Sequence, residues 1–387
     1  MECKRCGNKD PAYFYEGHKG IYCRKCIGFK RILLDEDTKS YEYSVSENVE
    51  KFYFDYPLTR YQQEVSDKCR NLIKEKDVLL HCVCGAGKTE LVVETISDFL
   101  KEGKKVCYAI SRKEVVIELE KRFRAIFRDA SVIGVYGGHH DVLSGDLIVC
   151  TTHQLFRYQK TFDLLIIDEV DAFPLKGNYE LMHIAINSAK GNIIYSTATV
   201  NDFLLKSIKK RNYEELTLFI RPSLKPLIEP LILYSNKFFL LLYMFRLMQT
   251  MTNQCIIFVS SKKECRRLYS VLKHLFSITY VYAESSKRKE NIEDFRNKKY
   301  QFILATTVLE RGITIKDVNV IILCFHKGVF DEGSLVQMLG RVGRNFLNPY
   351  GEAYILSCFR DEEINKADEL IKRANKEYEM SILRQGN

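Results

Sequence analysis

Short apolar runs alternate with amphipathic stretches along most of the chain, beginning near residue 77. Runs such as 78–83 and 164–167 are almost entirely apolar. Runs of this kind are typical of strands buried on both faces, as in a parallel sheet. The stretches between them carry apolar residues at helical spacing. Because strands and helices alternate, the pattern favours an α/β fold built on parallel sheets.

The alternation falls into two blocks, which predicts two α/β lobes with tandem sheets. In the first block we expect strands at 77–83, 106–110, 146–150, 164–168 and 193–196, with helices at 88–101 and 113–127. In the second block we expect strands at 255–260, 302–305, 318–324 and 352–356, with helices at 263–276 and 361–383.

Between the two blocks, the segment 201–230 interrupts the alternation of apolar runs and amphipathic stretches. It is basic and contains Pro222, Pro226 and Pro230, so we interpret it as the junction between the lobes. The apolar run that follows, 238–248, is too short to span a bilayer and predicts a buried helix.

The first forty or so residues hold two cysteine pairs, and a polar, aromatic connector follows at about 35–55. These shifts in composition predict three domains. Their expected boundaries are 1–45, 46–215 and 216–387.

The chain has 387 residues and a formal net charge of +9. This length is ample for a buried core, the apolar content is ordinary for a globular protein, and the charged fraction argues against wholesale disorder. A basic chain often binds nucleic acid, although the charge alone fits plain solubility equally well. No secretory signal follows Met1, and thirteen cysteines without such a signal indicate a reducing compartment. We therefore expect a cytoplasmic protein.

The segment 84–89, Cys-Gly-Ala-Gly-Lys-Thr, lies between an expected strand and an expected helix. Glycines in such a loop let backbone N–H groups wrap phosphates, a lysine reaches the β and γ phosphates, and a hydroxyl binds magnesium. Cys82 stands where the usual eight-residue pattern has its first glycine. A chance Gly-Lys-Thr in an ordinary loop is the alternative. The predicted nucleotide contacts are Gly85, Ala86, Gly87, Lys88 and Thr89.

A second candidate segment follows the apolar run 164–167, where Asp168 and Glu169 provide two carboxylates. We expect Asp168 to hold magnesium through water and Glu169 to orient and deprotonate the attacking water. A solvated acidic loop is the alternative, and it would suit the nearby Asp171 better than these two residues.

Gln62 lies shortly before the phosphate loop, where its amide could bond the adenine edge and favour ATP. A helix cap with a surface glutamine is the alternative.

Farther along the chain, Arg341 and Arg344 follow an apolar stretch, and we expect them at a helix start. An arginine inserted from a second lobe stabilises charge on a transferred phosphoryl group, so both are candidate catalytic residues.

Hydroxyl and basic residues follow several expected strands, where parallel α/β folds bind ligands. Those at 196–199 could relay between the acidic segment and the second lobe, although a plain polar turn is the alternative. The candidates for nucleic-acid contacts are Ser111, Arg112, Thr152, Ser260, Thr306 and Arg311.

The two N-terminal cysteine pairs have the spacing of a structural four-thiolate zinc site, with sixteen residues between them. A redox or chance cluster is the alternative, and His18 is a conceivable substitute ligand. The remaining nine cysteines lack ligand spacing and fall mostly in apolar runs, which favours core packing. The predicted zinc ligands are Cys3, Cys6, Cys23 and Cys26.

The motifs resemble, in order, the series of superfamily-two helicases, over about residues 56–344. The segments 168–174 (Asp-Glu-Val-Asp-Ala-Phe-Pro) and 310–312 (Glu-Arg-Gly) are more similar to ComFA-type late-competence ATPases than to RNA helicases. A cysteine finger ahead of the motor agrees with that family. In the related PriA-type helicases the cysteines interrupt the second half of the motor. The segments that carry the resemblance are 62, 85–89, 111–112, 168–171, 197–199, 306–312 and 337–344.

The resemblance implies two RecA-like P-loop domains after the finger, with ATP, Mg2+ and Zn2+ as cofactors. It also implies an ATP-dependent single-stranded DNA translocase that powers uptake of transforming DNA in natural competence. The expected partners are single-stranded DNA, a membrane DNA channel and a ComFC-like protein, which would bring the protein to the inner face of the cell membrane. Two alternatives remain: a DNA or RNA helicase of replication, repair or RNA metabolism, and an ATP-switched nucleic-acid-binding scaffold.

Overall fold

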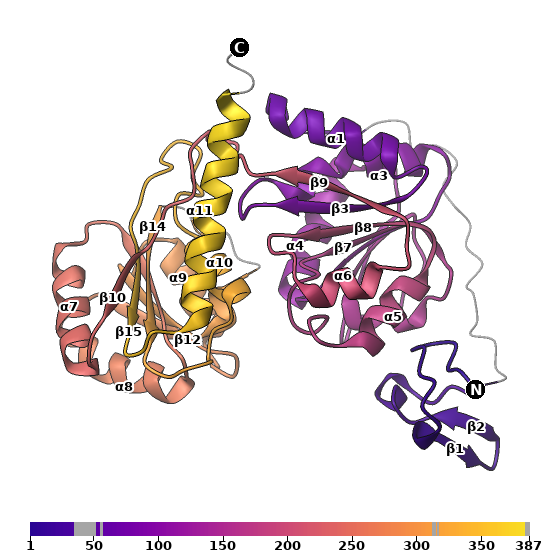
Figure 1. Ribbon diagram of the computed structural model, residues 1–387, viewed down its shortest axis with the longest axis horizontal. Coiled ribbons are helices and arrows are strands. Elements are labelled where there is room, and N and C mark those ends of the chain that lie inside the picture. Colours follow the sequence, from indigo (N-terminus) through magenta and orange to yellow (C-terminus); the bar gives the residue numbers. More distant parts are fainter. Residues whose placement is uncertain (35–51, 55–56, 312–314, 316, 384–387) are drawn as a thin grey trace. The chain divides into compact units, whose positions relative to one another are not determined.

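The computed structural model describes residues 1–34, 52–54, 57–311, 315 and 317–383. Most of the expected connector at 35–55 lies outside the described residues, as does Gly312. The chain divides into two compact units, one made of Met1–Cys82 and Gly87–Leu218 and the other of Val83–Ala86 and Phe219–Asn387. Each unit contains one parallel sheet, as the alternating pattern predicted (Figure 1).

The sheet of the first unit has the strand order β5-β6-β4-β7-β8-β3-β9, and every pair in it is parallel. All residues of β4 and β6 are buried, as expected for inner strands covered on both faces. The strands are β3 (Asp77–Cys82), β4 (Val106–Ile110), β5 (Val132–Val135), β6 (Leu147–Thr151), β7 (Phe162–Asp168), β8 (Ala189–Thr197) and β9 (Tyr213–Leu218).

Helices flank this sheet, and Figure 1 shows α1 and α3 side by side. The expected helix at 88–101 is divided at Val92, whose N–H bonds to the Glu90 carbonyl and closes a short first helix. The helical elements are α1 (Arg60–Leu72), α2 (Lys88–Leu91), α3 (Val93–Lys101), α4 (Lys113–Ile126), η3 (Thr152–Arg157), α5 (Tyr179–Ser188) and α6 (Asp202–Ile208).

The N-terminal segment forms a small antiparallel hairpin, β1 (Phe14–Gly17) with β2 (Gly20–Cys23), between the 3-10 turns η1 (Pro11–Tyr13) and η2 (Ile27–Phe29). It packs against α5 and η3 within the first unit. Lys25 Nζ lies 2.7 Å from Glu180 Oε1, and Asn187 Nδ2 donates to the Lys4 carbonyl over 2.8 Å. The Phe29 ring lies 5.6 Å from that of Phe156.

The sheet of the second unit has the order β10-β15-β14-β11-β13-β12, again with every pair parallel. Its strands are β10 (Leu231–Tyr234), β11 (Gln254–Phe258), β12 (Ile278–Val281), β13 (Phe302–Ala305), β14 (Val318–Cys324) and β15 (Ala353–Ser357). Its helical elements are α7 (Lys237–Thr250), α8 (Lys262–Leu272), α9 (Arg288–Arg296), η4 (Thr307–Leu309), α10 (Glu332–Leu339) and α11 (Glu362–Leu383).

The prediction of a junction over 201–230 was wrong for its first half. The segment contains α6 and β9, and β9 pairs with β3 at the edge of the first sheet. An edge strand need not be apolar throughout, and in β9 only Leu216 and Leu218 are buried. A search for apolar runs therefore overlooked it.

The prediction of a buried helix at 238–248 was correct for only one face of α7. Only Leu240, Met244 and Met248 of α7 are buried, whereas Phe238 is 67% and Phe239 58% exposed. The run is apolar around the whole helix, but the sheet covers one face. No helix in the described part of the chain is both long enough and apolar enough to cross a membrane.

Candidate nucleotide and nucleic-acid site

The phosphate loop connects the end of β3 to the start of α2, as the sequence predicted. Gly85 and Gly87 have φ angles of 82° and 83°, in the left-handed region that glycine adopts without a steric penalty. A Cβ on Gly87 would lie 2.5 Å from Gln62 Nε2, so the loop approaches another side chain closely there. Lys88 and Thr89 form the first turn of α2, where N–H groups lack helical partners and suit phosphate.

Asp168 ends β7 and is only 7% exposed. Its Oδ1 accepts hydrogen bonds from the Ser196 hydroxyl at 2.9 Å and from the Glu169 N–H at 3.0 Å. Its Oδ2 accepts from the Tyr108 hydroxyl at 2.8 Å. A buried carboxylate and the nearby Thr89 hydroxyl are hard oxygen ligands, so these residues fit Mg2+.

Tyr108 was not among the predicted site residues. It lies on β4, and its hydroxyl is 3.4 Å from Thr89 Oγ1 as well as within hydrogen-bond distance of Asp168. Burial, and then the Asp168 charge, raise the pKa of Tyr108 well above its ordinary value, so the phenol keeps its proton. The available signal in the sequence was a single hydroxyl-bearing residue inside an apolar strand.

Glu169 is half-buried and has a φ angle of 55°, which is uncommon outside glycine. Backbone in this region costs free energy, and it is found most often at functional sites. The left-handed turn directs the chain away from β7 directly after Asp168. Its role as the residue that activates water stays a prediction.

The acidic segment is also bonded to the segment after β8. Thr199 Oγ1 donates to Asp171 Oδ2 over 2.8 Å, and Thr197 Oγ1 donates to the Thr199 carbonyl over 2.7 Å. Asp171 is buried, so the solvated acidic loop that we considered for it is wrong. Together with the bond from Ser196 to Asp168, these contacts join the two segments within the first unit.

Gln62 is buried near the start of α1 and takes part in a capping box. Its side-chain Oε1 accepts from the Thr59 N–H at 2.9 Å, and the Thr59 side chain accepts from the Gln62 N–H. The cap that we considered is therefore present, although the glutamine is not on the surface. Its Nε2 lies beside Gly87, and contact with an adenine edge stays a prediction.

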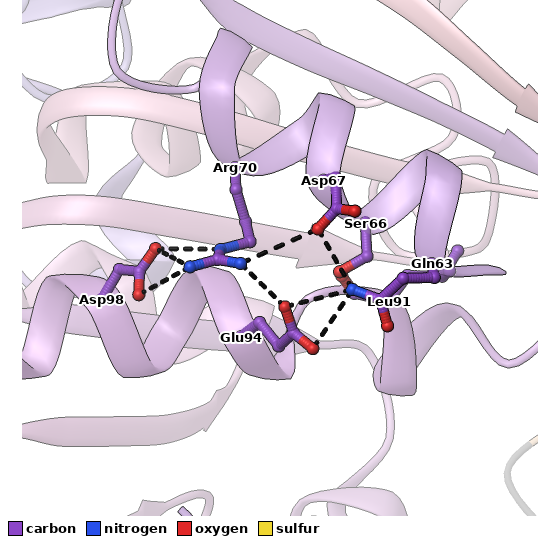
Figure 2. Close-up of polar contacts among 7 residues, drawn as sticks. All are labelled: Gln63, Ser66, Asp67, Arg70, Leu91, Glu94 and Asp98. Carbon is purple, nitrogen blue, oxygen red and sulfur yellow. Dashed lines mark hydrogen bonds and ion pairs between the residues drawn. The ribbon is translucent and has the colours of Figure 1, made fainter. Parts of the chain in front are cut away.

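Figure 2 shows polar contacts that hold α1 against α2 and α3. The Arg70 guanidinium donates to Asp98 Oδ2 from Nε at 2.9 Å and to Glu94 Oε2 from Nη1 at 2.9 Å. Ser66 Oγ donates to the Leu91 carbonyl over 2.8 Å. These contacts position the helix that carries Gln62, and no pattern in the sequence predicted the pairing.

The two candidate arginines of the second unit follow the end of α10, so the predicted helix start was wrong. Gly340 terminates α10, and the chain turns through Gly343, whose φ angle is 69°. Arg341 is 2% exposed, with Nε 3.2 Å from the Glu310 carbonyl, whereas Arg344 is half-buried and donates to the Gly340 carbonyl.

Arg221 forms hydrogen bonds with this turn. It was not among the predicted site residues, because the sequence analysis assigned it to the basic junction. It is 3% exposed and donates to the carbonyls of Val342 at 2.8 Å and Gly340 at 3.1 Å. Burial and the charge of Arg344 lower its pKa to about 10, so Arg221 is still a cation at neutral pH.

The candidates for nucleic-acid contacts differ in accessibility. Thr152, at 0% exposed, and Arg311, at 4%, are buried, and the Arg311 side chain bonds to Glu310. Ser260 is half-buried and donates to Glu264. Ser111, Arg112 and Thr306 are half-buried near strand ends. Their contacts with nucleic acid remain predictions.

The four N-terminal cysteines are brought together and buried. Their sulfur atoms all lie within 4.8 Å of one another, as ligands of one metal ion would. Arg5 is buried beside them and donates to Cys26 Sγ from Nη2 at 3.1 Å. A four-thiolate zinc centre carries excess negative charge, so this guanidinium suits it. The geometry supports a metal site, and the cysteine spacing was sufficient to predict it.

Two family models match the chain. Residues 55–202 match the model of the type III restriction enzyme, res subunit, and residues 236–346 match the helicase conserved C-terminal domain. Competence protein ComFA of Streptococcus pneumoniae is 31% identical, over 97% of this chain and 90% of that protein. The chain belongs to the ComFA family. ComFA of Bacillus subtilis is 30% identical, over 96% of this chain and 85% of that protein.

The fold has a wider distribution than the ComFA family. The Saccharomyces cerevisiae protein Dbp5, solved bound to RNA and ADP BeF3, superposes with a TM-score of 0.57 at 17% identity, over 82% of this chain and 91% of that chain. The two sheets are therefore the RecA-like pair of helicases, as the resemblance implied. This ComFA-family chain is a nucleic-acid-dependent ATPase of the helicase type, for which ATP and Mg2+ are the expected cofactors.

Proposed function

We propose that this protein is an ATP-dependent single-stranded DNA translocase that powers the uptake of transforming DNA. The observation that carries the proposal is its similarity along nearly the whole chain to two proteins named competence protein ComFA. That similarity covers 97% and 96% of this chain, so it extends over both segments that match the helicase-type family models.

In the proposed cycle, Gly85, Ala86, Gly87 and Lys88 bind the phosphates, and Gln62 bonds the adenine. Thr89 and Asp168 hold magnesium, which supplies positive charge to the β and γ phosphates. Glu169 takes the proton from the attacking water. Arg341 and Arg344 stabilise charge on the phosphoryl group as the bond to the leaving phosphate breaks. Contacts made by the partly exposed Ser111, Arg112, Ser260 and Thr306 with the DNA backbone would then alter during each turnover, and the buried Thr152 and Arg311 would join them only after a local rearrangement.

We assign Zn2+ to Cys3, Cys6, Cys23 and Cys26, on the basis of their spacing and their clustered sulfur atoms. We also propose the division into a finger at 1–45, a nucleotide-binding domain at 46–215 and a second helicase domain at 216–387. A membrane DNA channel and a ComFC-like protein are the proposed partners, and they would bring the protein to the inner face of the membrane.

The first test is ATP turnover by the purified protein, alone and with single-stranded DNA, duplex DNA or RNA. Turnover stimulated only by single-stranded DNA supports the proposal. A second assay, displacement of streptavidin from a biotinylated single strand, separates directional movement from stimulated hydrolysis. Lys88→Ala is the control that should not displace streptavidin.

Other outcomes would favour the alternatives. Preferential stimulation by RNA would indicate an RNA helicase. Hydrolysis with no stimulation by any nucleic acid would indicate a switch or a partner-dependent enzyme. The cysteine finger and the carboxylate of Glu169 favour the translocase over these two.

A further inference from the structure

Hydrogen bonds from the described residues leave one acceptor position of the Asp168 carboxylate open. A carboxylate offers about four lone-pair positions, two on each oxygen. Ser196 and Glu169 occupy both positions on Oδ1, at 2.9 and 3.0 Å. Tyr108 occupies one position on Oδ2, at 2.8 Å. The remaining position therefore lies on the oxygen that Tyr108 holds.

The Tyr108 hydroxyl also determines how the Thr89 hydroxyl is oriented. A phenol has one proton, and a carboxylate can only accept, so Tyr108 donates to Asp168. In the contact of 3.4 Å between Tyr108 and Thr89, Thr89 must then be the donor. Its proton points toward Tyr108, which leaves the lone pairs of Thr89 Oγ1 available to a cation.

We propose that Tyr108 is a positioning residue of the magnesium site, because it orients Asp168 Oδ2 and the Thr89 hydroxyl so that both keep an acceptor lone pair for the ion. Residues that form hydrogen bonds with metal ligands commonly raise the affinity of the site for the metal. Tyr108 lies on β4, outside every segment that carries the family resemblance. The proposal depends on nucleotide binding by the helicase fold and not on DNA uptake.

A purely structural role for Tyr108 is the competing explanation. The residue is fully buried, and its ring lies 5.4 Å from that of Phe123. Tyr195 provides a matched control on β8, since it is equally buried and its hydroxyl lies 3.4 Å from Asp77 Oδ2 at the opposite end of β3 from the phosphate loop. Removing either hydroxyl leaves the ring in place, but only Tyr108→Phe alters the oxygens of Asp168 and Thr89.

The test measures how magnesium affects binding of a fluorescent, non-hydrolysable ATP analogue to the full-length protein. We expect Tyr108→Phe to bind the analogue in EDTA as the wild type does. In a MgCl2 titration, it should require about tenfold more magnesium for half of the binding enhancement. Tyr195→Phe should match the wild type in both conditions. The magnesium concentration needed for half-maximal ATP turnover should rise by a similar factor.

Two results would overturn the proposal. One is an unchanged magnesium midpoint for Tyr108→Phe, and the other is an equal loss of affinity with and without magnesium. If Tyr108→Phe does not fold, Tyr108→Met provides a second variant, because the unbranched methionine fills irregular core space without a hydroxyl. The same displaced midpoint is expected for it, and a wild-type midpoint would equally contradict the proposal.

Discussion

At the scale of single residues, the site depends on a few side chains whose environments differ sharply. Lys88 begins a helix and is half-buried, Asp168 is bonded through both oxygens, and Glu169 occupies a left-handed turn. These environments suit the three residues to different roles. The lysine suits phosphate binding, the aspartate a fixed ligand position, and the glutamate contact with water.

Lys88→Ala should abolish ATP turnover. The substitution removes the positive charge expected at the β and γ phosphates, and loss of one such interaction costs about 10²–10³-fold in rate. Phosphate release at saturating single-stranded DNA measures the effect. Lys101→Ala, an exposed lysine at the end of α3, is the control. Normal turnover by Lys88→Ala would remove the phosphate-loop assignment.

Glu169→Gln should bind ATP but hydrolyse it at least about 10²-fold more slowly. The amide keeps the shape of the side chain but cannot accept the proton of the attacking water. Nucleotide binding and single-turnover hydrolysis separate the two steps. Glu118→Gln on the exposed side of α4 should be normal. Wild-type hydrolysis by the Glu169 variant would contradict the role of general base.

At the scale of elements, polar contacts between helices decide where the first unit places α1. The sequence predicted neither the bidentate pair of Arg70 with Asp98 nor the bond from Ser66 to the Leu91 carbonyl. Both cross from α1 to the helices that follow the phosphate loop. They therefore stabilise the position of α1, which carries Gln62 beside Gly87.

Arg70→Met should lower the free energy of unfolding of the first unit by about 1–2 kcal/mol. Charge-assisted bonds contribute more than neutral ones, but the side chain is partly exposed and solvent reduces the effect. Denaturant unfolding measures the change. Arg60→Met, which loses only an exposed pair with Glu64 on the same helix, should change stability by less than about 0.5 kcal/mol. Equal effects of the two variants would show that the interhelical contacts contribute little.

At the scale of the whole molecule, the N-terminal cysteine segment is part of the first unit. The four cysteines belong to the same apolar cluster as residues of β4, β6, β7 and β8, and the ion pair of Lys25 with Glu180 adds a polar contact. The segment was predicted as a separate domain from its composition. Metal binding is consequently expected to stabilise more than the hairpin.

Cys23→Ser should lower the zinc content and the thermal stability of the first unit. Three remaining thiolates hold the ion less tightly, and loss of a structural zinc removes folding free energy. Atomic absorption and thermal unfolding measure the two effects, and a chelator should reproduce the second in the wild type. Cys358→Ser, which alters a cysteine outside the cluster, should retain the metal. Unchanged zinc in Cys23→Ser would refute the ligand set.

Much of the fold could be predicted because its signals are local. The bounds of β4, β13 and β14 agree with the apolar runs that predicted them, since inner strands of a parallel sheet are buried on both faces and mostly apolar, although β14 includes the buried Asn319. The edge strand β9 and the exposed face of α7 could not be predicted in this way. Whether an apolar residue is covered depends on which element packs against it.

The sequence by itself determined the phosphate loop, the acidic strand end and the cysteine cluster. These motifs combine residues that are close along the chain or repeated at a fixed spacing, and glycine adopts the left-handed turns at Gly85 and Gly87 without a steric penalty. Only the tertiary structure decided that Tyr108 meets Asp168, sixty residues away, and that Arg221 meets the turn at Gly340. Such pairs leave no periodic pattern, because they form only when distant segments pack side by side.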